Sequence, residues 1–408
     1  MLLTAIRSLP RDGRALFAAR FIRLFAYGSL SVVLVFYLTG IGLSESQTGM
    51  LLTLTLLGDT AVSLALTTQA DRIGRRRMLI AGAVLMIAAG VVFALTRNFL
   101  FLVIAGTIGV ISPSGNEVGP FLPIEQAALS QVSDAPALTG VFAWYTLTGA
   151  IATASGSLFA GLLTSTLEGA AIPQVASQRS VVLVYAGLGL LLALLFTRLS
   201  PAVEAHRGEG TLLGVSTSRG VVFRLSALFA LDAFGGGFVV QSFAAYWFYL
   251  RFGVAPATLG GIFFGANILA GFSALVASRL AARFGLVRTM VWTHLPSNVL
   301  LIAVPLMPSL SLATLVLWLR FSISQMDVPT RQAYTMAIVP PEERSAAAGI
   351  LGVARTTGAA IAPFFAGLMF ARPALINLPF FIAGTLKIAY DLVLLKYAGS
   401  SGKSGQLE

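Results

Sequence analysis

TTQADRIGRRR, residues 67–77, joins two long apolar runs of the chain. One acid, one glycine and four arginines in so short a link are typical of a tight cytoplasmic turn between two membrane helices. Gly74 permits the turn because it has no Cβ atom. The arginines are expected to stay in the lipid headgroup region, and Asp71 is expected to face a helix N-terminus or an arginine.

The composition of the chain is that of a membrane protein. Of 408 residues, 57% are hydrophobic and 11% are charged, and the mean hydropathy is +0.87. Soluble domains carry about 25% charged residues, so the sequence predicts an integral membrane protein. There is no cysteine, and the two histidines, His206 and His294, are far apart in sequence. We therefore expect no metal site and no cofactor.

Apolar runs long enough to cross a bilayer recur along the chain. A helix needs about 20 apolar residues for this, and only helix satisfies the backbone of such isolated runs in lipid. Arg7, Arg11 and Arg14 precede the first run, which reads as an uncleaved span. Twelve runs are found, at approximately 15–40, 48–69, 78–96, 99–128, 138–165, 180–199, 222–250, 257–280, 288–307, 310–337, 345–370 and 374–396.

Lysine and arginine residues predict the orientation of these spans. With twelve spans, both termini lie on the same side of the membrane. If that side is the cytoplasm, the inside segments hold 17 basic residues and the outside segments hold four. This bias predicts cytoplasmic N and C termini in an inner (plasma) membrane. It also explains the net charge of +11 without a nucleic-acid partner.

The two halves of the sequence repeat each other. For example, Phe36-Tyr37-Leu38 recurs as Phe248-Tyr249-Leu250, and Pro123-x-x-Gln126-Ala127 recurs as Pro329-x-x-Gln332-Ala333. Five such echoes follow the same order in each half, which indicates a duplication. We expect an N-terminal six-helix bundle over 1–199, a cytoplasmic linker over 200–221, a C-terminal six-helix bundle over 222–398 and a disordered tail over 399–408.

The turn at 67–77 resembles the signature loop of the major facilitator superfamily, between its second and third helices. The family pattern is Gly-x-x-x-Asp-Arg-x-Gly-Arg-Arg/Lys-Arg/Lys. Asp71, Arg72, Gly74 and Arg75–Arg77 match it, whereas Thr67 stands at the first glycine. The resemblance implies an all-α membrane protein of 12 transmembrane helices in two pseudo-symmetric six-helix bundles, with spans 1, 4, 7 and 10 lining a central cavity. We expect a monomer.

Charged residues inside the spans mark the candidate site. Each costs roughly 2.5–3.5 kcal/mol at mid-bilayer, so it is expected to face a partner or water. Six acids and six bases lie within the predicted spans, and eight of the twelve fall on spans 1, 4, 7 and 10. With neighbouring polar residues they give a predicted substrate and proton pathway of Arg20, Arg23, Tyr27, Asn116, Glu117, Asp232, Gln241, Arg320, Asp327 and Arg331.

Glu117 lies in the most unusual stretch of these spans, Ser112–Pro120, where prolines and glycines free carbonyls and kink a helix. A carboxyl group among apolar helices can keep its proton unless an arginine holds it ionised. Glu117 is therefore a candidate proton carrier or substrate contact. The alternative is a structural pair with Arg20 or Arg23.

Other charged or flexible positions also have two interpretations. Tyr27 offers a hydroxyl to substrate or serves in packing. Asp327 and Arg331 form part of a polar track or neutralise each other at i, i+4. Gly235–Gly237 is a bending point or a place of close helix approach.

A second set of residues is predicted to control gating. Asp59 and Arg355 lie roughly 17 Å from the cytoplasmic ends of their spans, at about 1.5 Å per residue, and are expected to form an interlobe latch. The set is completed by the turn residues Asp71, Arg72, Gly74 and Arg75. Lys387 and Asp391, four residues apart in span 12, are predicted to form a structural pair.

These features predict a secondary transporter that works by alternating access. No Walker loop is present, which favours protons over ATP as the source of work. Proton-coupled efflux of a small organic molecule is the main hypothesis. Because arginine binds carboxylate and phosphate well, proton-coupled or facilitated transport of an organic anion is the alternative. An intramembrane enzyme is disfavoured by the lack of a convergent nucleophile or metal set, and a channel or receptor by the duplicated halves.

Overall fold

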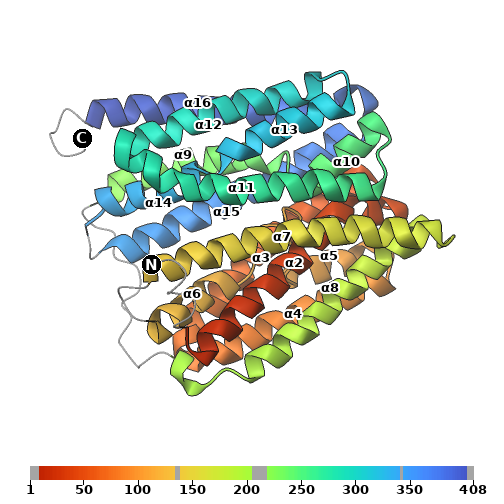
Figure 1. Ribbon diagram of the computed structural model, residues 1–408, viewed down its shortest axis with the longest axis horizontal. Helices are drawn as coiled ribbons and strands as arrows, with labels where there is room; N and C mark the ends of the chain where they lie inside the picture. Colours follow the sequence, from red (N-terminus) through yellow and green to blue (C-terminus); the bar gives the residue numbers. More distant parts are fainter. Residues whose placement is uncertain (1–8, 134–137, 205–217, 341–342, 402–408) are drawn as a thin grey trace. The chain divides into compact units, whose positions relative to one another are not determined.

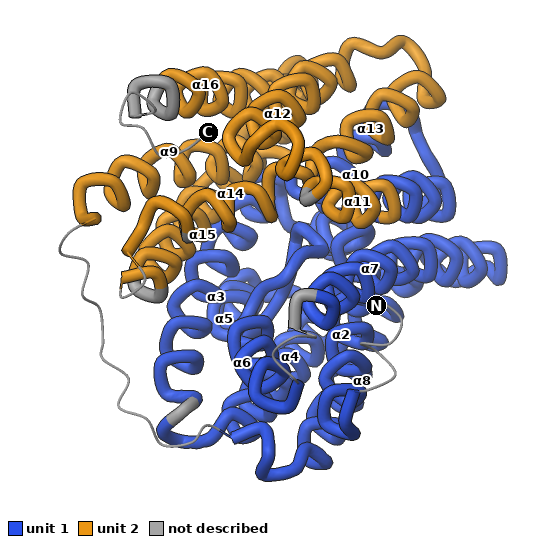
Figure 2. Tube along the Cα trace, turned by 60° about the vertical axis from the view of Figure 1, so that its left-hand side comes forward, with its two compact units in different colours: residues 1–209, 240–267 blue, residues 210–239, 268–408 orange. Residues whose placement is uncertain are grey.

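The computed structural model describes residues 9–133, 138–204, 218–340 and 343–401, and these residues form helices joined by short links (Figure 1). The chain groups into two compact units (Figure 2). Unit 1 comprises residues 1–209 and 240–267, and unit 2 comprises residues 210–239 and 268–408. The predicted linker falls mostly on residues 205–217 and the predicted tail mostly on 402–408, and both stretches lie outside the described residues.

Unit 1 contains most of the sequence that precedes the linker, together with one later segment. Tight contacts hold α2 against α7 and α8, and α3 packs against α5 and α4. The helices of unit 1 are α2 (Arg11–Gly40), α3 (Glu45–Ile73), α4 (Arg75–Leu95), α5 (Phe99–Ile108), α6 (Phe121–Val132), α7 (Leu138–Gly169), α8 (Gln174–Thr197), η2 (Pro201–Val203), α10 (Gln241–Phe252) and the first part of α11 (Pro256–Phe284).

Unit 2 is built around the pairing of α9 with α15 and of α12 with α16. Its apolar core includes Leu225 and Phe229 of α9, Met290 of α12, Leu351 of α15 and Tyr390 of α16. The helices of unit 2 are α9 (Arg219–Gly237), the rest of α11, α12 (Leu286–Ala303), η3 (Val304–Leu306), α13 (Leu310–Ser324), α14 (Asp327–Ile338), α15 (Arg344–Phe370), η5 (Pro373–Leu375) and α16 (Leu378–Ser401).

Ten helices of the described residues are long and apolar enough to cross a membrane. They correspond to ten of the twelve predicted spans, and the all-α prediction is confirmed. The fourth and tenth predicted spans are the exceptions, because each is divided between two helices of 15 residues or fewer. The seventh is also broken, between α9 and α10, but together these helices still reach membrane length over Arg219–Phe252. The predicted boundaries of the two bundles differ from the contact units at residues 240–267, and those boundaries stay a prediction.

The break in the fourth span is longer than the kink expected from its prolines. Helix α5 ends at Ile108, α6 begins at Phe121, and the twelve residues between them are not helical. Gly115 and Gly119 adopt left-handed backbone angles of +69° and +80°, which a residue with a Cβ atom rarely adopts. Pro113 and Pro120 cannot donate backbone hydrogen bonds, so a helix cannot continue through this segment without loss.

Close helix approach occurs in both units, between the helices of predicted spans 1 and 5 and between those of predicted spans 7 and 11. In unit 1, an added Cβ on Gly156 of α7 would lie 2.0 Å from the carbonyl oxygen of Phe25 in α2. In unit 2, an added Cβ on Gly358 of α15 would lie 2.4 Å from the carbonyl oxygen of Ala230 in α9. Small residues at such contacts let membrane helices pack backbone to backbone. The span 1–5 pair and the span 7–11 pair are thus built in the same way.

Candidate functional site

A cluster of buried charges lies in unit 1, where α2 faces α6 and the non-helical residues 109–120, called the interrupted segment below. Arg20 donates to Glu117 at 2.5 Å. Arg23 donates to Glu117 at 3.1 Å and makes two bonds to Glu125, of 2.5 and 2.8 Å. Tyr145 of α7 donates its hydroxyl to Glu125, and the guanidinium of Arg20 lies 4.3 Å from the ring of Tyr145. Two arginines and two glutamates therefore balance one another within a single unit.

Glu117 is the member of this cluster most open to solvent. Its side chain is 17% exposed, whereas those of Arg23 and Glu125 are 0% exposed. Pairing of Glu117 with both Arg20 and Arg23 is the structural alternative considered for it from the sequence. The role of Glu117 as proton carrier or substrate contact stays a prediction.

Hydroxyl groups satisfy the carbonyls of the interrupted segment. Bilayer-depth backbone that is not helical needs such partners inside the protein. The donor–acceptor pairs are Tyr185 to Val110, Ser242 to Pro113, Thr153 to Gly115, Ser112 to Asn116 and Tyr27 to Val118. Tyr27 is completely buried, and its contact with substrate stays a prediction.

Gln241 lies at the start of α10 and is the centre of a polar network in unit 1. Its amide nitrogen donates to Ser31 at 2.8 Å and to Ser157 at 3.1 Å. Its amide oxygen accepts a bond of 3.1 Å from Asn267. Asn116, the other predicted amide of the pathway, is exposed. Of the two amides, Gln241 therefore has the more extensive set of protein partners.

Unit 2 contains a second buried cluster, centred on Asp232 of α9. Lys387 of α16 donates to one carboxylate oxygen at 2.7 Å, and Arg331 of α14 donates to the other at 3.3 Å. Arg331 also donates to Asp327 at 2.7 Å, so the predicted i, i+4 contact is present. The expected Lys387–Asp391 pair is wrong, because the lysine reaches across to α9. Arg320 of α13 is partly buried, and its Nε has no hydrogen-bond partner among the described residues.

Asp391 is bonded instead to two residues of α12. His294 contacts one of its carboxylate oxygens at 2.8 Å, and Asn298 donates to the other at 2.9 Å. From the sequence, His294 served only as evidence against a metal site. Ligand atoms of Asp232, His294 and Asp327 do lie within 4.8 Å of one another. Lys387 and Arg331 already neutralise Asp232, which disfavours a divalent cation there.

The turn at residues 74–77 is held by Glu204, which sequence reasoning missed. The Glu204 carboxylate accepts from the backbone N–H of Arg75 at 2.6 Å and of Arg76 at 3.3 Å. An anion at this position complements the positive N-terminus of α4. The Arg75 side chain donates to Gln131 at 2.8 Å. The only sequence signal for Glu204 was an acid just after span 6, next to the turn in the predicted cytoplasmic layer.

The other residues predicted to control gating have the following positions, and their role in gating stays a prediction. Arg72 is exposed, and the side chain of Asp71 lies outside the described part of the structure. Asp59 belongs to unit 1 and Arg355 to unit 2. Asp59 is buried, and the Nε of Arg355 has no hydrogen-bond partner among the described residues. The Asp59–Arg355 latch stays a prediction.

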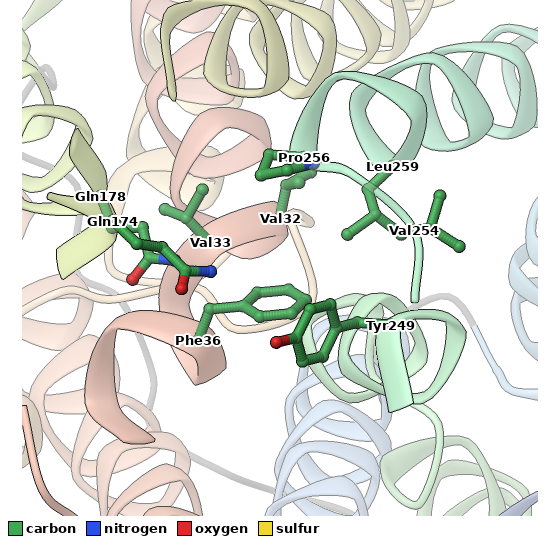
Figure 3. Close-up of a pocket in the computed structure, with 9 residues that line it drawn as sticks. All are labelled: Val32, Val33, Phe36, Gln174, Gln178, Tyr249, Val254, Pro256 and Leu259. Atoms are coloured by element: carbon green, nitrogen blue, oxygen red, sulfur yellow. The ribbon is translucent and has the colours of Figure 1, made fainter. Parts of the chain in front are cut away.

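A small apolar pocket lies near the C-terminal end of α2 in unit 1 (Figure 3). Phe36 and Tyr249 face each other in it, with ring centroids 5.2 Å apart. Its other lining residues are Val32, Val33, Gln174, Gln178, Val254, Pro256 and Leu259. Phe36 lies about 20 Å along the helix from Arg23, at 1.5 Å per residue, so this pocket is separate from the charge cluster of unit 1.

Ten membrane-length helices, several interrupted spans and a buried charge cluster within each unit define a multi-pass membrane protein with transporter architecture. The chain belongs to the Major Facilitator Superfamily, whose model matches residues 16–326. It is similar to the uncharacterized membrane protein YJR124C of Saccharomyces cerevisiae, with 30% identity over 418 residues that cover 94% of this chain and 93% of the relative.

Solved structures share the same fold. A bacterial homolog of the human lysosomal transporter Spinster, in an inward-facing state, is 17% identical with a TM-score of 0.69 and covers 95% of both chains. The nucleoside transporter NupG is 14% identical with a TM-score of 0.73, over 95% of this chain and 99% of its own. The D-xylose-proton symporter is 15% identical with a TM-score of 0.70, over 94% and 97%. Family and fold together make the chain a secondary transporter of a small-molecule substrate.

Proposed function

We propose that this protein carries out proton-coupled efflux of a small organic molecule by antiport. The observation that supports the proposal is the pair of buried charge clusters, one around Arg23 in unit 1 and one around Asp232 in unit 2. Charges buried at bilayer depth are expensive and usually mark a substrate or proton path. Glu117, with 17% of its side chain exposed, is the point at which the unit 1 cluster meets solvent.

Alternating access requires elements that bend. We propose that residues 1–199 and 222–398 rock against each other and that the break between α9 and α10 gives way during this motion. Helix α9 ends at Gly237, the third of three consecutive glycines, and α10 starts at Gln241. Glycine weakens a helix by about 1 kcal/mol relative to alanine, so this is the weakest part of the span. The latch between Asp59 and Arg355 and the turn residues Asp71, Arg72, Gly74 and Arg75 are assigned to gating.

The proposed setting is the inner (plasma) membrane, with both termini in the cytoplasm and the protein working as a monomer and not as an enzyme. The bias of lysine and arginine towards the inside segments supports this orientation. The turn that holds Arg72 and Arg75–Arg77 then lies in the cytoplasmic headgroup layer.

Transport of an organic anion is the second candidate. Arg320 and Arg355 support it, because each has an Nε atom without a hydrogen-bond partner among the described residues. A guanidinium with a donor to spare suits a carboxylate or phosphate ligand. By contrast, Arg20, Arg23 and Arg331 already make ion pairs within their units, although the Nε of Arg20 also has no hydrogen-bond partner among the described residues.

The proposal is tested by flux into proteoliposomes of the purified protein, with empty liposomes as the control. Labelled lipophilic cations and labelled aromatic carboxylates are supplied separately, each with and without an imposed pH gradient. Proton antiport predicts that a cation is driven against the direction of proton flow and that the flux collapses when the gradient is dissipated. Cation flux that ignores the gradient contradicts proton coupling, and carboxylate flux without cation flux supports the second candidate.

A further inference from the structure

Four polar side chains form a stripe along α3. Thr48, Thr55, Asp59 and Ser63 are spaced by seven, four and four residues, so they fall within about 80° of one another around the helix at 100° per residue. From Thr48 to Ser63 the stripe extends about 22 Å along the helix axis, at 1.5 Å per residue. The stripe therefore follows a large part of the thickness of the hydrocarbon core.

Each member of the stripe has a buried polar atom without a hydrogen-bond partner among the described residues. These atoms are the hydroxyls of Thr48, Thr55 and Ser63 and the Oδ1 of Asp59. The hydroxyl of Thr107, on the facing helix α5, also has no hydrogen-bond partner among the described residues. Most buried polar atoms in proteins have a partner in the chain or in bound water, so four orphaned atoms on one face of α3, with a fifth on the helix that packs against it, point to a ligand.

Other hydroxyls of α3 do not share this property. Thr60 donates to the carbonyl of Leu56 at 3.0 Å, and Thr67 donates to that of Ser63 at 2.7 Å. Threonines within a helix commonly satisfy themselves in this way. The orphaned atoms are thus confined to one face of α3, and they are not a general feature of its hydroxyl groups.

Asp59 stands in the middle of the stripe and differs from the clustered acids of both units. Glu117, Glu125, Asp232 and Asp327 each contact an arginine or lysine. Asp59 instead accepts a hydrogen bond from the backbone N–H of Gly119. The described ion pairs of unit 1 do not include it.

Most of the groups that face Asp59 from neighbouring elements already form hydrogen bonds or ion pairs with other residues. Tyr27 of α2 and Tyr185 of α8 are its electrostatic neighbours, and both donate their hydroxyls to carbonyls of the interrupted segment. Glu117, of that segment, is paired with Arg20 and Arg23, and Glu125 of α6 with Arg23. The arginines of α4 are at its cytoplasmic start, beyond Ile73, about 20 Å along α3 from Asp59 at 1.5 Å per residue. Thr107 of α5 contributes the remaining polar group.

We propose that Asp59 is a proton-binding residue and that the stripe of α3 is the hydrated route by which protons reach it. This inference rests on the proposed proton coupling and names a site for it. A carboxyl group without a cation can exist uncharged when buried, which removes the cost of an isolated charge. Hydroxyl groups both donate and accept hydrogen bonds, so they suit a relay of ordered water.

A proton fits the stripe better than a sodium ion. A metal cation needs several oxygen ligands within about 2.5 Å of one point. Successive members of the stripe are about 6 Å apart along the axis, at 1.5 Å per residue, and one pair is farther apart. They are therefore arranged in a line and not around a point. Protonation also removes the negative charge that the predicted latch with Arg355 requires, so proton binding and the latch exclude each other.

Infrared difference spectroscopy of the purified protein tests proton binding directly. We expect a carboxylic-acid carbonyl band that appears as the pH is lowered, is lost in Asp59→Asn and is retained in Glu117→Gln. A band that is unchanged in Asp59→Asn, or lost in Glu117→Gln instead, overturns the assignment. This readout needs no substrate, so it stands or falls separately from the transport hypothesis.

The route is tested with two threonines of the same helix. Thr55→Val removes an orphaned hydroxyl, whereas Thr60→Val removes a hydroxyl bonded to its own helix. We expect Thr55→Val to slow proton release from liposomes loaded with the protein, and Thr60→Val to leave it at the wild-type rate. Equal rates in both variants contradict the relay.

Stimulation by a sodium gradient that persists without a pH gradient and is lost in Asp59→Asn assigns the site to sodium instead. If Asp59 titrates in the spectrum but solute flux ignores the pH gradient, the site survives and the proposed antiport fails.

Discussion

Arg23 meets Glu125 in two parallel hydrogen bonds, of 2.5 and 2.8 Å, and neither side chain is exposed to solvent. Bidentate arginine–carboxylate pairs are strong, but removing one partner leaves an uncompensated buried charge. We expect Glu125→Ala to destabilise the protein by about 3–5 kcal/mol. The double change of Arg23→Met with Glu125→Leu should recover much of that loss, because it buries no charge. Thermal unfolding in detergent, followed by tryptophan fluorescence, measures both. A double variant less stable than Glu125→Ala contradicts this account.

Substitution of Glu117 distinguishes a role of this residue in transport from a purely structural role. It is partly exposed and is shared by Arg20 and Arg23. If it carries a proton or contacts substrate, Glu117→Gln should abolish gradient-driven flux while lowering stability by only about 1–3 kcal/mol, the range for an unsatisfied buried partner. Flux in proteoliposomes and thermal unfolding are measured on the same preparation. Glu168→Gln, at the C-terminal end of α7, is the control. Wild-type flux with a lowered melting temperature supports the structural alternative.

Lys387 provides a test of partner choice in unit 2. Because its ammonium lies 2.7 Å from Asp232, a double-mutant cycle of Lys387→Met with Asp232→Asn should give a coupling energy in the range of about 0.5–3 kcal/mol. The cycle of Lys387→Met with Asp391→Asn should give a smaller one, since Asp391 is bonded to His294 and Asn298. Unfolding in denaturant gives the four free energies of each cycle. A larger coupling to Asp391 restores the pairing expected from the sequence.

The general fold could be predicted because its signals are local. The turn at residues 67–77 and the apolar runs each depend on a short stretch of chain, and membrane insertion leaves helix as the main solution for such runs. The break in span 4 was only partly predictable. Pro113 and Pro120 indicated a kink, but the length of the non-helical segment depends on hydroxyl donors from distant helices, such as Tyr185 and Ser242.

The partners of the charged residues could not be derived from spacing. Lys387 and Asp391 are four residues apart on one helix, yet each is bonded to another helix. In lipid, every buried charge competes for the nearest opposite charge in three dimensions, and sequence separation does not limit that choice. His294 had a usable signal, because an ionisable side chain within a predicted span is a functional hypothesis by default. The stripe of unpartnered polar atoms along α3 had no such signal in the sequence, since threonine and serine usually form hydrogen bonds within their own helix.

Gly74 is expected to be required at the turn between α3 and α4. Its φ angle is +118°, and an added Cβ would lie 3.3 Å from both carboxylate oxygens of Glu204. Gly74→Ala should therefore cost about 1–3 kcal/mol of stability, the range for a strained backbone position. Gly220→Ala, near the start of α9, is the control because nothing lies within 4 Å of its added Cβ. The melting temperature of Gly74→Ala should therefore be lower than that of Gly220→Ala. Equal melting temperatures show that a side chain does not strain the turn.

Gly156 tests whether the contact between α2 and α7 depends on the absence of a side chain. An added Cβ would lie 2.0 Å from the carbonyl oxygen of Phe25 and 2.9 Å from the backbone nitrogen of Ser29. Both obstacles are backbone atoms, so the helices must move apart, and overpacking of this kind typically costs about 1–3 kcal/mol. Gly187→Ala on α8 meets nothing within 4 Å and should be neutral or stabilising, because alanine favours helix. Thermal unfolding should therefore rank Gly156→Ala below wild type and Gly187→Ala at or above it. If both variants melt together, α2 and α7 tolerate a wider separation, and their close approach is not what holds unit 1 together.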